Sequence, residues 1–287
     1  MAKTTGLVLT GGGLRGVCAE AGALQALEEM GYRFDAVIGT SAGAIVGALY
    51  ASGLGAGELT GRLRSLREED YLDPISRFTL LVGLSRELRG VTGYYRGEAL
   101  LRWLERNLAE RRIEDCDPPL YITVTNVSRG VPQVKSQGPL AAFARASSAI
   151  PLVFALQRVD DEYYGDGGAA NNVPVDELNR LRPDLEQLLV ITALRVERPE
   201  PEPNNDFLRQ EWTPVRALGR VLDAIAEGQR LDNLNAPQKI VVLQTRTLNL
   251  DLDNVDRIGE AIDLTYATTK ERIAAGEFDL SDVPRNP

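Results

Sequence analysis

Histidine is absent from the 287-residue chain. Its absence excludes every serine or cysteine nucleophile whose general base is an imidazole, and every zinc site with histidine ligands. A nucleophilic serine in this chain would need aspartate, glutamate or lysine as its base. The lysines are only Lys3, Lys135, Lys239 and Lys270, and none of them lies in an S-x-x-K motif. A carboxylate is therefore the expected partner.

Cysteine and long apolar runs are also scarce. Cys18 and Cys116 fit no metal-ligand or redox spacing, so we expect two free thiols. No run approaches the roughly 18 apolar residues of a membrane span, and the first apolar run, Gly6 to Leu9, is too short for a signal peptide. The sequence thus predicts a soluble, cytoplasmic protein without a metal or cofactor.

Basic residues are outnumbered by acidic ones, and the formal net charge is -9. Nucleic-acid binding requires a basic excess or a dense basic stripe, and the sequence has neither. Apolar residues make up 44% of the chain, which suffices for a substantial core, and no internal repeat or low-complexity linker divides it. We expect a single domain over residues 1–287.

The most informative stretch runs from Asp35 to Gly47, where a short apolar strand is followed by a sharp turn and a helix rich in alanine and glycine. Within it, Ser41 lies between Gly39 and Gly43 in the pattern G-x-S-x-G, which is typical of a nucleophile elbow. Glycine is required at both flanks because a Cβ there would collide as the helix folds back beside the strand. The alternative is that Ser41 only caps the helix.

A second glycine-rich segment follows the predicted first strand, Gly6 to Thr10, and precedes a helix predicted from about Val17 to Met30. Three interpretations are open. The pattern G-x-G-x-x-G is the dinucleotide fingerprint, but the acidic residue it requires after the second strand is missing, because Asp35 precedes that strand. Alternatively, the backbone N–H groups form an oxyanion hole beside Ser41, or the segment is only a structural loop. The residues concerned are Gly11, Gly12, Gly13, Leu14, Arg15 and Gly16.

Residues 56–118 have a different composition, with helix-forming segments rich in arginine and glutamate such as 58–70 and 97–112. This pattern predicts a helical insertion that caps the site. Within it, residues 74–97 combine arginines with apolar and tyrosine residues. Such a segment could contact an anionic lipid surface, or it could simply pack as a cap with solvated arginines.

Two further motifs lie between residues 120 and 170. A predicted strand, 120–125, turns into a second run, 131–136, and is followed by a helix that ends before Pro151. Asp166 then lies among Gly165, Gly167 and Gly168. By itself this is most simply an Asp-Gly turn. The neighbouring carboxylates belong to a charged run that indicates a solvated turn, and they are Asp160, Asp161 and Glu162.

The C-terminal third alternates between helices and strands. We expect helices at 174–181, 213–231 and 255–275, strands at 187–193 and 239–244, and a surface loop at 196–205. Residues 251–256 have the spacing of aspartates that suggests calcium, but they lack the glycine and the final acid of a calcium loop. We therefore predict no calcium site.

Taken in order, four motifs resemble those of the patatin-like phospholipases. They are Gly11 to Gly16, Gly39 to Gly43, Ala146 to Pro151 and Asp166 to Gly168. The resemblance is closest over residues 6–55 and 120–175. It implies a three-layer α/β/α fold with a mainly parallel central sheet and a helical cap insertion.

The same resemblance implies an acyl hydrolase that uses a Ser-Asp dyad. Ser41 would be the nucleophile, Asp166 the base, and Gly11 to Gly16 the oxyanion hole. The implied substrate is a lipid or another acyl ester, with no cofactor. The alternative is an inactive protein of the same fold that binds acyl lipids or regulates a partner.

Overall fold

The computed structural model describes residues 3–76, 91–194, 236–248, 250, 252 and 255–285. An eight-stranded sheet lies at its centre, in the order β10-β9-β1-β2-β4-β8-β7, with β5 also paired to β4. The parallel strands are β1 (Thr5–Leu9), β2 (Ala36–Gly39), β4 (Leu120–Asn126), β9 (Gln187–Leu194) and β10 (Lys239–Arg246). The antiparallel strands are β5 (Val131–Lys135), β7 (Gln157–Val159) and β8 (Glu162–Asp166).

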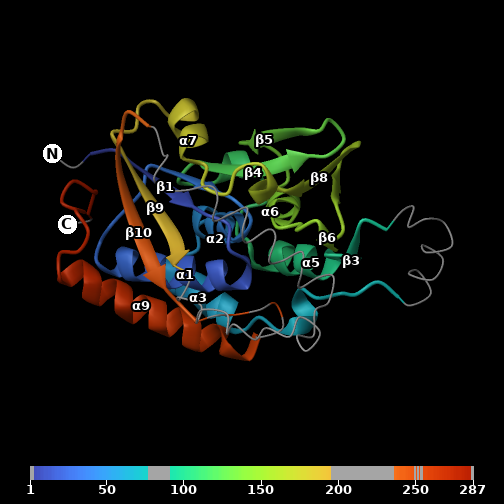
Figure 1. Cartoon of the computed structure of the whole chain (residues 1–287), viewed down its shortest axis with the longest axis horizontal. Coiled ribbons are helices and arrows are strands. Elements are labelled where there is room, and N and C mark those ends of the chain that lie inside the picture. The colour runs from blue at the N-terminus through green and yellow to red at the C-terminus, as the bar shows by residue number, and fades with distance from the viewer. Residues whose placement is uncertain are drawn as a thin grey trace, which may run out of the picture.

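Helices cover both faces of this sheet. Figure 1 shows α1 (Gly13–Glu29) and α9 (Ile258–Ala274) beneath it, with α2 (Ala42–Ala51) next to them. On the opposite face lies α7 (Val175–Leu181). The two long helices approach closely at Gly22, where a Cβ would come within 2.6 Å of the Ile262 carbonyl oxygen. The small residues of α1 therefore allow α9 to pack directly on it.

The described part of the chain contains several further short elements. They are α3 (Ala56–Arg64), η1 (Glu68–Asp70), β3 (Gly93–Tyr95), α5 (Glu98–Asn107), η2 (Ile113–Asp115), α6 (Leu140–Ser147), β6 (Leu152–Phe154), η3 (Gly167–Ala169) and η5 (Val255–Arg257). Of these, β3 and β6 pair in parallel as a separate two-stranded sheet. Buried side chains form a large core on the α1 side of the central sheet and a smaller one under α7. The burial of apolar surface in these cores is the main stabilising term.

The predicted α/β/α layers with a mainly parallel sheet are confirmed. The predicted elements at 6–10, 36–38, 120–125, 174–181, 187–193 and 239–244 all have counterparts. Both cysteines are free and buried, and desolvation raises the pKa of each thiol to about 12. None of the described helices combines the length and the apolar character needed to cross a membrane.

Several boundaries were wrong. The first helix begins at Gly13 rather than Val17, because Gly13 itself, at φ 58, turns the chain into the helix. Residues 58–70 divide into α3 and η1, and within 97–112 the helix α5 already ends at Asn107. Asp166 ends a β-strand of the β7–β8 hairpin instead of lying in an isolated turn.

Some predictions fall on residues that the structure does not describe. These are the loop at 196–205, the helix at 213–231, most of the rejected calcium loop and the part of 74–97 that spans 77–90. The single domain, the cap insertion and the cytoplasmic location stay predictions.

Candidate active site

Ser41 lies at the turn between β2 and α2, with φ 53 and ψ -112. A positive φ is uncommon in a residue other than glycine and marks local strain, as expected at a nucleophile elbow. The flanking glycines are sterically required. A Cβ on Gly39 would lie 2.3 Å from the Gly43 carbonyl oxygen, and one on Gly43 would lie 2.5 Å from the Leu9 carbonyl oxygen. The backbone therefore fixes the position of Ser41.

The Ser41 hydroxyl donates a hydrogen bond of 2.9 Å to Oδ2 of Asp166. Both residues are buried, each with 6% of its surface exposed. The other carboxylate oxygen, Oδ1, accepts the N–H of Gly168 at 2.7 Å. The Asp166 backbone is also held, because its N–H donates to the Ala149 carbonyl at 3.1 Å and its carbonyl accepts the Thr125 hydroxyl at 2.8 Å. The structure thus brings together the two residues that the sequence singled out.

Burial raises the pKa of Asp166 to about 7, although the hydrogen bonds from Gly168 and Ser41 lower it in part. Desolvation disfavours the charged carboxylate, whereas each hydrogen-bond donor favours it. An aspartate in this environment titrates near neutrality, in the range that histidine normally provides. It can accept a proton from a hydroxyl and return it more readily than an exposed aspartate.

Ser147 has a structural part in the site that was not predicted from the sequence. Its hydroxyl accepts the backbone N–H of Ser41 at 2.8 Å and donates to the Thr123 carbonyl at 2.6 Å. Ser147 therefore joins α6 to the elbow and to β4. The only signal in the sequence was its place in the third of the four motifs, Ala146 to Pro151, and that motif did not indicate this contact.

The glycine-rich segment lies directly beside Ser41, since a Cβ on Gly11 would be 3.4 Å from the Ser41 Cβ. The backbone N–H groups of this segment differ in whether they already donate a hydrogen bond. The Gly11 N–H donates to the Asn172 carbonyl at 3.2 Å, and the Gly16 N–H donates to the Gly12 carbonyl at 2.9 Å. Among the described residues, the N–H groups of Gly12 and Gly13 have no acceptor. Both N–H groups are available as donors, at the positive end of the α1 dipole.

The rest of the predicted oxyanion segment belongs to the first turn of α1. Leu14 and Gly16 are buried and Arg15 is half-buried. The N–H of Ala42, directly after the serine, also lacks an acceptor in the described part of the chain. Sequence analysis missed it, although the residue after the nucleophile is a usual oxyanion donor in such elbows.

Two carboxylates contact the backbone at opposite ends of β1. Glu20 is completely buried, and its Oε1 accepts the N–H of Thr10 at 2.6 Å, directly before the glycines. Desolvation raises the pKa of Glu20 well above its usual value. Asp35 accepts the N–H of Thr5 at 2.7 Å, at the far end of β1 from the glycines. It is not placed to contact a ribose, which disfavours the dinucleotide interpretation.

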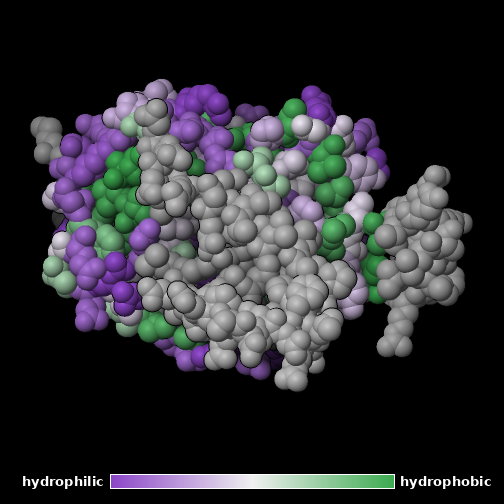
Figure 2. All heavy atoms as spheres, in the orientation of Figure 1, coloured by the Kyte–Doolittle hydropathy of each residue, from purple (hydrophilic) through white to green (hydrophobic). Residues whose placement is uncertain are grey.

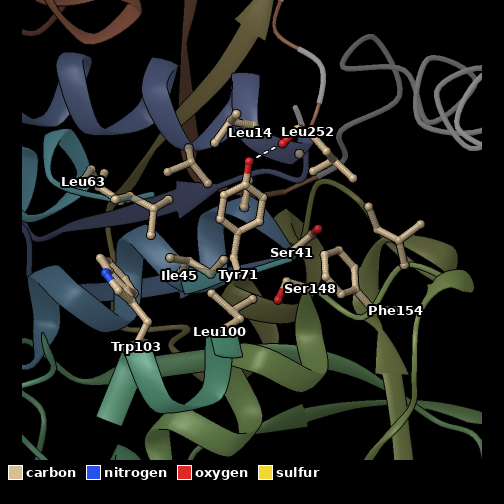
Figure 3. A pocket seen from close by; sticks show the side chains of 15 residues that line it. Leu14, Ser41, Ile45, Leu63, Tyr71, Leu100, Trp103, Ser148, Phe154 and Leu252 are labelled. Atoms are coloured by element: carbon tan, nitrogen blue, oxygen red, sulfur yellow. Dashed lines mark hydrogen bonds between the residues drawn. The ribbon is translucent and has the colours of Figure 1, made fainter. Parts of the chain in front are cut away.

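An apolar pocket opens onto the serine. Figure 3 shows Ser41 on its wall, with Phe154 on one side and Tyr71, Ile45, Leu100 and Trp103 extending to the other. The Tyr71 hydroxyl donates to the Leu252 carbonyl. No charged side chain lines the pocket in the described part of the chain. The lining residues are Gly13, Leu14, Val17, Ser41, Ala42, Ile45, Leu63, Leu66, Tyr71, Leu100, Trp103, Ser148, Ile150, Phe154 and Leu252.

The alternative carboxylates do not reach the serine. Asp161 pairs with Arg158 at 2.8 Å, and Glu162 accepts a hydrogen bond from the Asn126 side chain at 2.9 Å. The first contact lies within the β7–β8 hairpin, where Asp160 occupies the turn with φ 53, and the second joins β8 to β4. Asp166 is the carboxylate that contacts Ser41.

The fold and the site together define an α/β protein in which a serine after the parallel strand β2 is hydrogen-bonded to an aspartate at the end of the antiparallel strand β8, beside an apolar pocket. The family model described as "Patatin-like phospholipase" matches residues 7–179. The chain belongs to the patatin-like phospholipase family.

Similar proteins include "Patatin-like phospholipase domain-containing protein 6" of Homo sapiens, which is 34% identical over 178 residues, or 61% of this chain and 12% of that protein. "Lysophospholipase nte1" of Aspergillus niger is 29% identical over 213 residues, or 74% of this chain and 13% of that protein. This chain thus matches a small part of much longer relatives. The crystal structure of VipD from Legionella pneumophila has a TM-score of 0.47 at 16% identity, covering 96% of this chain and 67% of that chain.

Proposed function

We propose that this protein is a serine acyl hydrolase that cleaves lipid esters through a Ser41–Asp166 dyad. The observation that carries the proposal is the 2.9 Å hydrogen bond from Ser41 to a buried carboxylate, in a chain without histidine. Membership in a family named for phospholipase activity supports it, as does the similarity to a protein named lysophospholipase.

In the first half-reaction, Ser41 Oγ attacks the ester carbonyl carbon while its proton passes to Asp166. The carbonyl oxygen becomes an oxyanion. When the tetrahedral intermediate collapses, Asp166 returns the proton to the departing alcohol, and the acyl group stays bound to Ser41. In the second half-reaction, water attacks the acyl-enzyme and gives its proton to Asp166. Collapse of this second intermediate releases the carboxylic acid and restores the Ser41 hydroxyl with that proton.

The N–H groups of Gly12, Gly13 and Ala42 are the proposed oxyanion donors. They border the serine, have no acceptor among the described residues and lie at the N-termini of α1 and α2. A developing negative charge is favoured there by the free N–H groups and by both helix dipoles. The Ser41 N–H is excluded from this role because Ser147 accepts it.

The pocket indicates the acyl part of the substrate. Its wall is formed by aliphatic and aromatic side chains from α1, α2, α3, α5 and β6. Such a wall binds a hydrocarbon chain and provides no partner for a charged head group. We therefore infer that the acyl chain lies in the pocket and that the alcohol or head group stays outside it.

Hydrolysis of p-nitrophenyl esters of increasing acyl length tests this proposal. Each buried methylene contributes about 0.8 kcal/mol, so kcat/KM for the octanoate ester should exceed that for the acetate ester by roughly tenfold or more. Fatty-acid release from lysophosphatidylcholine, measured in parallel, would extend the result to a lipid. Absence of turnover on every ester, with retained binding of a fatty acid, would instead favour an inactive acyl-lipid-binding protein.

Gly12→Ala is expected to reduce kcat by roughly 10²-fold or more while changing KM little, because oxyanion donors act mainly on the transition state. The new Cβ would lie 2.9 Å from the Gly16 Cα, so the first turn of α1 must shift. Gly57→Ala in α3 is the matched control, since its Cβ would have no neighbour within 4 Å. If Gly12→Ala changes KM as strongly as kcat, or if Gly57→Ala lowers kcat by the same factor, Gly12 is not an oxyanion donor.

A further inference from the structure

Exposed apolar side chains gather on the surface formed by β3, β4, β6 and β8. We call the set Tyr94, Val127, Leu152 and Tyr163 the rim patch. Their exposed fractions are 44%, 44%, 66% and 47%. In Figure 2, several separate groups of hydrophobic residues lie right of centre, in the region where Figure 1 places β3, β6 and β8. Exposed apolar residues grouped in this way indicate an interaction surface.

Backbone contacts show that these four residues come from neighbouring segments of the chain. Gly93, next to Tyr94, pairs with Leu152 across the β3–β6 sheet. Farther along, the Leu156 N–H donates to the Thr92 hydroxyl at 3.1 Å.

The other half of the rim patch connects through Gly165. A Cβ there would lie 3.1 Å from a methyl group of Leu156 and 3.5 Å from one of Val127. The Val127 N–H in turn donates to the Tyr163 carbonyl at 2.8 Å. The patch therefore extends from the β3–β6 sheet to the edge of the central sheet.

Leu152 is the unusual member of the rim patch. Its φ of 64 lies in the left-handed region, which disfavours a large aliphatic residue, and its side chain is the most exposed of the four. Burial in the described core does not explain this leucine, because 66% of its surface is exposed. Strained residues with exposed apolar side chains are found where a surface has a function.

The position of Leu152 relates it to the substrate. Ile150 and Phe154, which precede and follow it by two residues, both line the pocket beside Ser41. Leu152 therefore lies in a segment that forms part of the pocket wall, while its own side chain is exposed.

The composition around the rim patch suits a phospholipid surface. Tyr94 and Tyr163 have an apolar ring and a polar hydroxyl, the combination that favours the water–lipid interface. The exposed cations Arg96, Arg129 and Arg158 lie on the same segments. Arg129 and Arg158 also pair with Glu162 and Asp161, so the local charge is nearly balanced. Apolar insertion, rather than net charge, is expected to dominate binding.

We propose that the rim patch is the surface by which this protein binds a phospholipid bilayer, with Leu152 entering the interface beside the pocket. The inference rests on the proposed lipid hydrolysis for its purpose. The sequence suggested lipid contact through residues 74–97. The proposed surface includes Tyr94 from that segment and adds Val127, Leu152 and Tyr163 from outside it. Membrane binding would then place the pocket directly against the layer that holds the substrate.

Cosedimentation with phosphatidylcholine vesicles tests the surface. The Ser41→Ala protein is used for binding, so that hydrolysis does not alter the vesicles. Leu152→Asn is the test variant, because asparagine tolerates the left-handed region and the backbone is kept. It should weaken vesicle binding by roughly tenfold, as expected for loss of a buried leucine side chain. Leu264→Asn on α9 removes a leucine that is 38% exposed elsewhere, and should leave binding unchanged.

Activity provides the second readout. Introduced alone, Leu152→Asn should lower hydrolysis of vesicle phospholipid by a similar factor and leave turnover of soluble p-nitrophenyl butyrate unchanged. A protein that hydrolyses the soluble ester, but whose vesicle binding is unaffected by Leu152→Asn, would overturn the inference and leave the proposed function intact. If Leu152→Asn weakens vesicle binding but the unmodified protein hydrolyses no ester, the proposed function is overturned and the inference about the surface stands. Leucine-dependent self-association of the chain, without vesicle binding, would assign the surface to a second copy and overturn the inference.

Discussion

Ser41→Ala is expected to reduce ester hydrolysis by roughly 10⁴-fold or more, because the nucleophile and its base act as one unit. The fold should remain, since the glycines at 39 and 43 determine the shape of the turn and the change removes a single hydroxyl. Steady-state kcat/KM on a soluble ester and the far-ultraviolet circular dichroism spectrum measure the two effects. Ser52→Ala, which removes another buried hydroxyl at the end of α2, is the control and should retain activity. Substantial turnover by purified Ser41→Ala would exclude this serine as the nucleophile.

Asp166→Asn is expected to cause a loss of similar size. The amide keeps the shape of the carboxylate and can still accept the Gly168 N–H, but it cannot take the serine proton. In the unmodified protein, kcat/KM should fall about tenfold per pH unit below pH 7 and reach a plateau above it, because burial raises the pKa of Asp166 to about 7. The double variant with Ser41→Ala should be no less active than either single variant. A pH profile without this acidic limb would contradict the assignment of Asp166 as base.

The same pKa has a consequence for stability. Because the folded-state pKa of Asp166, about 7, exceeds the usual value of 3.8, the folded state favours the protonated carboxyl. Stabilisation from this group is fully present below about pH 4 and is lost as the pH rises through about 7. Asp166→Asn removes that loss, so the variant should melt at a higher temperature than the unmodified protein at pH 8. The gain in the free energy of unfolding is roughly 4 kcal/mol at most. The difference in melting temperature between the two proteins should be smaller at pH 5 than at pH 8.

Much of the site was predictable because local sterics determine it. Gly39 and Gly43 are required by close backbone contacts on both sides of Ser41, and those contacts are implied by a serine between a strand and a helix. The lack of histidine made a carboxylate the expected base, and the resemblance to the patatin-like phospholipases, rather than elimination, pointed to Asp166. The order of parallel strands then accounts for why the glycine segment and the elbow lie side by side.

Other parts depend on contacts between residues distant in the sequence and could not be predicted. Ser147 holds the N–H of a residue 106 positions away, and nothing in its own segment indicates this contact. The pocket wall combines Leu63, Trp103 and Phe154, which come from three separate elements. The β7–β8 hairpin was missed because its strands are short and its turn contains charged residues. The early start of α1 depends on the left-handed conformation of Gly13, which a glycine permits but does not require.

Site-specific labelling with a fluorophosphonate is the most direct measurement of the proposed function. The reagent forms a covalent bond with an activated serine and leaves unactivated serines unmodified. After digestion, mass spectrometry should find the adduct on Ser41, with no adduct in Ser41→Ala and much slower labelling in Asp166→Asn. Labelling of the unmodified protein should slow below pH 7, as Asp166 becomes protonated. An unlabelled Ser41, or labelling at the same rate without the Asp166 carboxylate, would contradict a Ser41–Asp166 dyad.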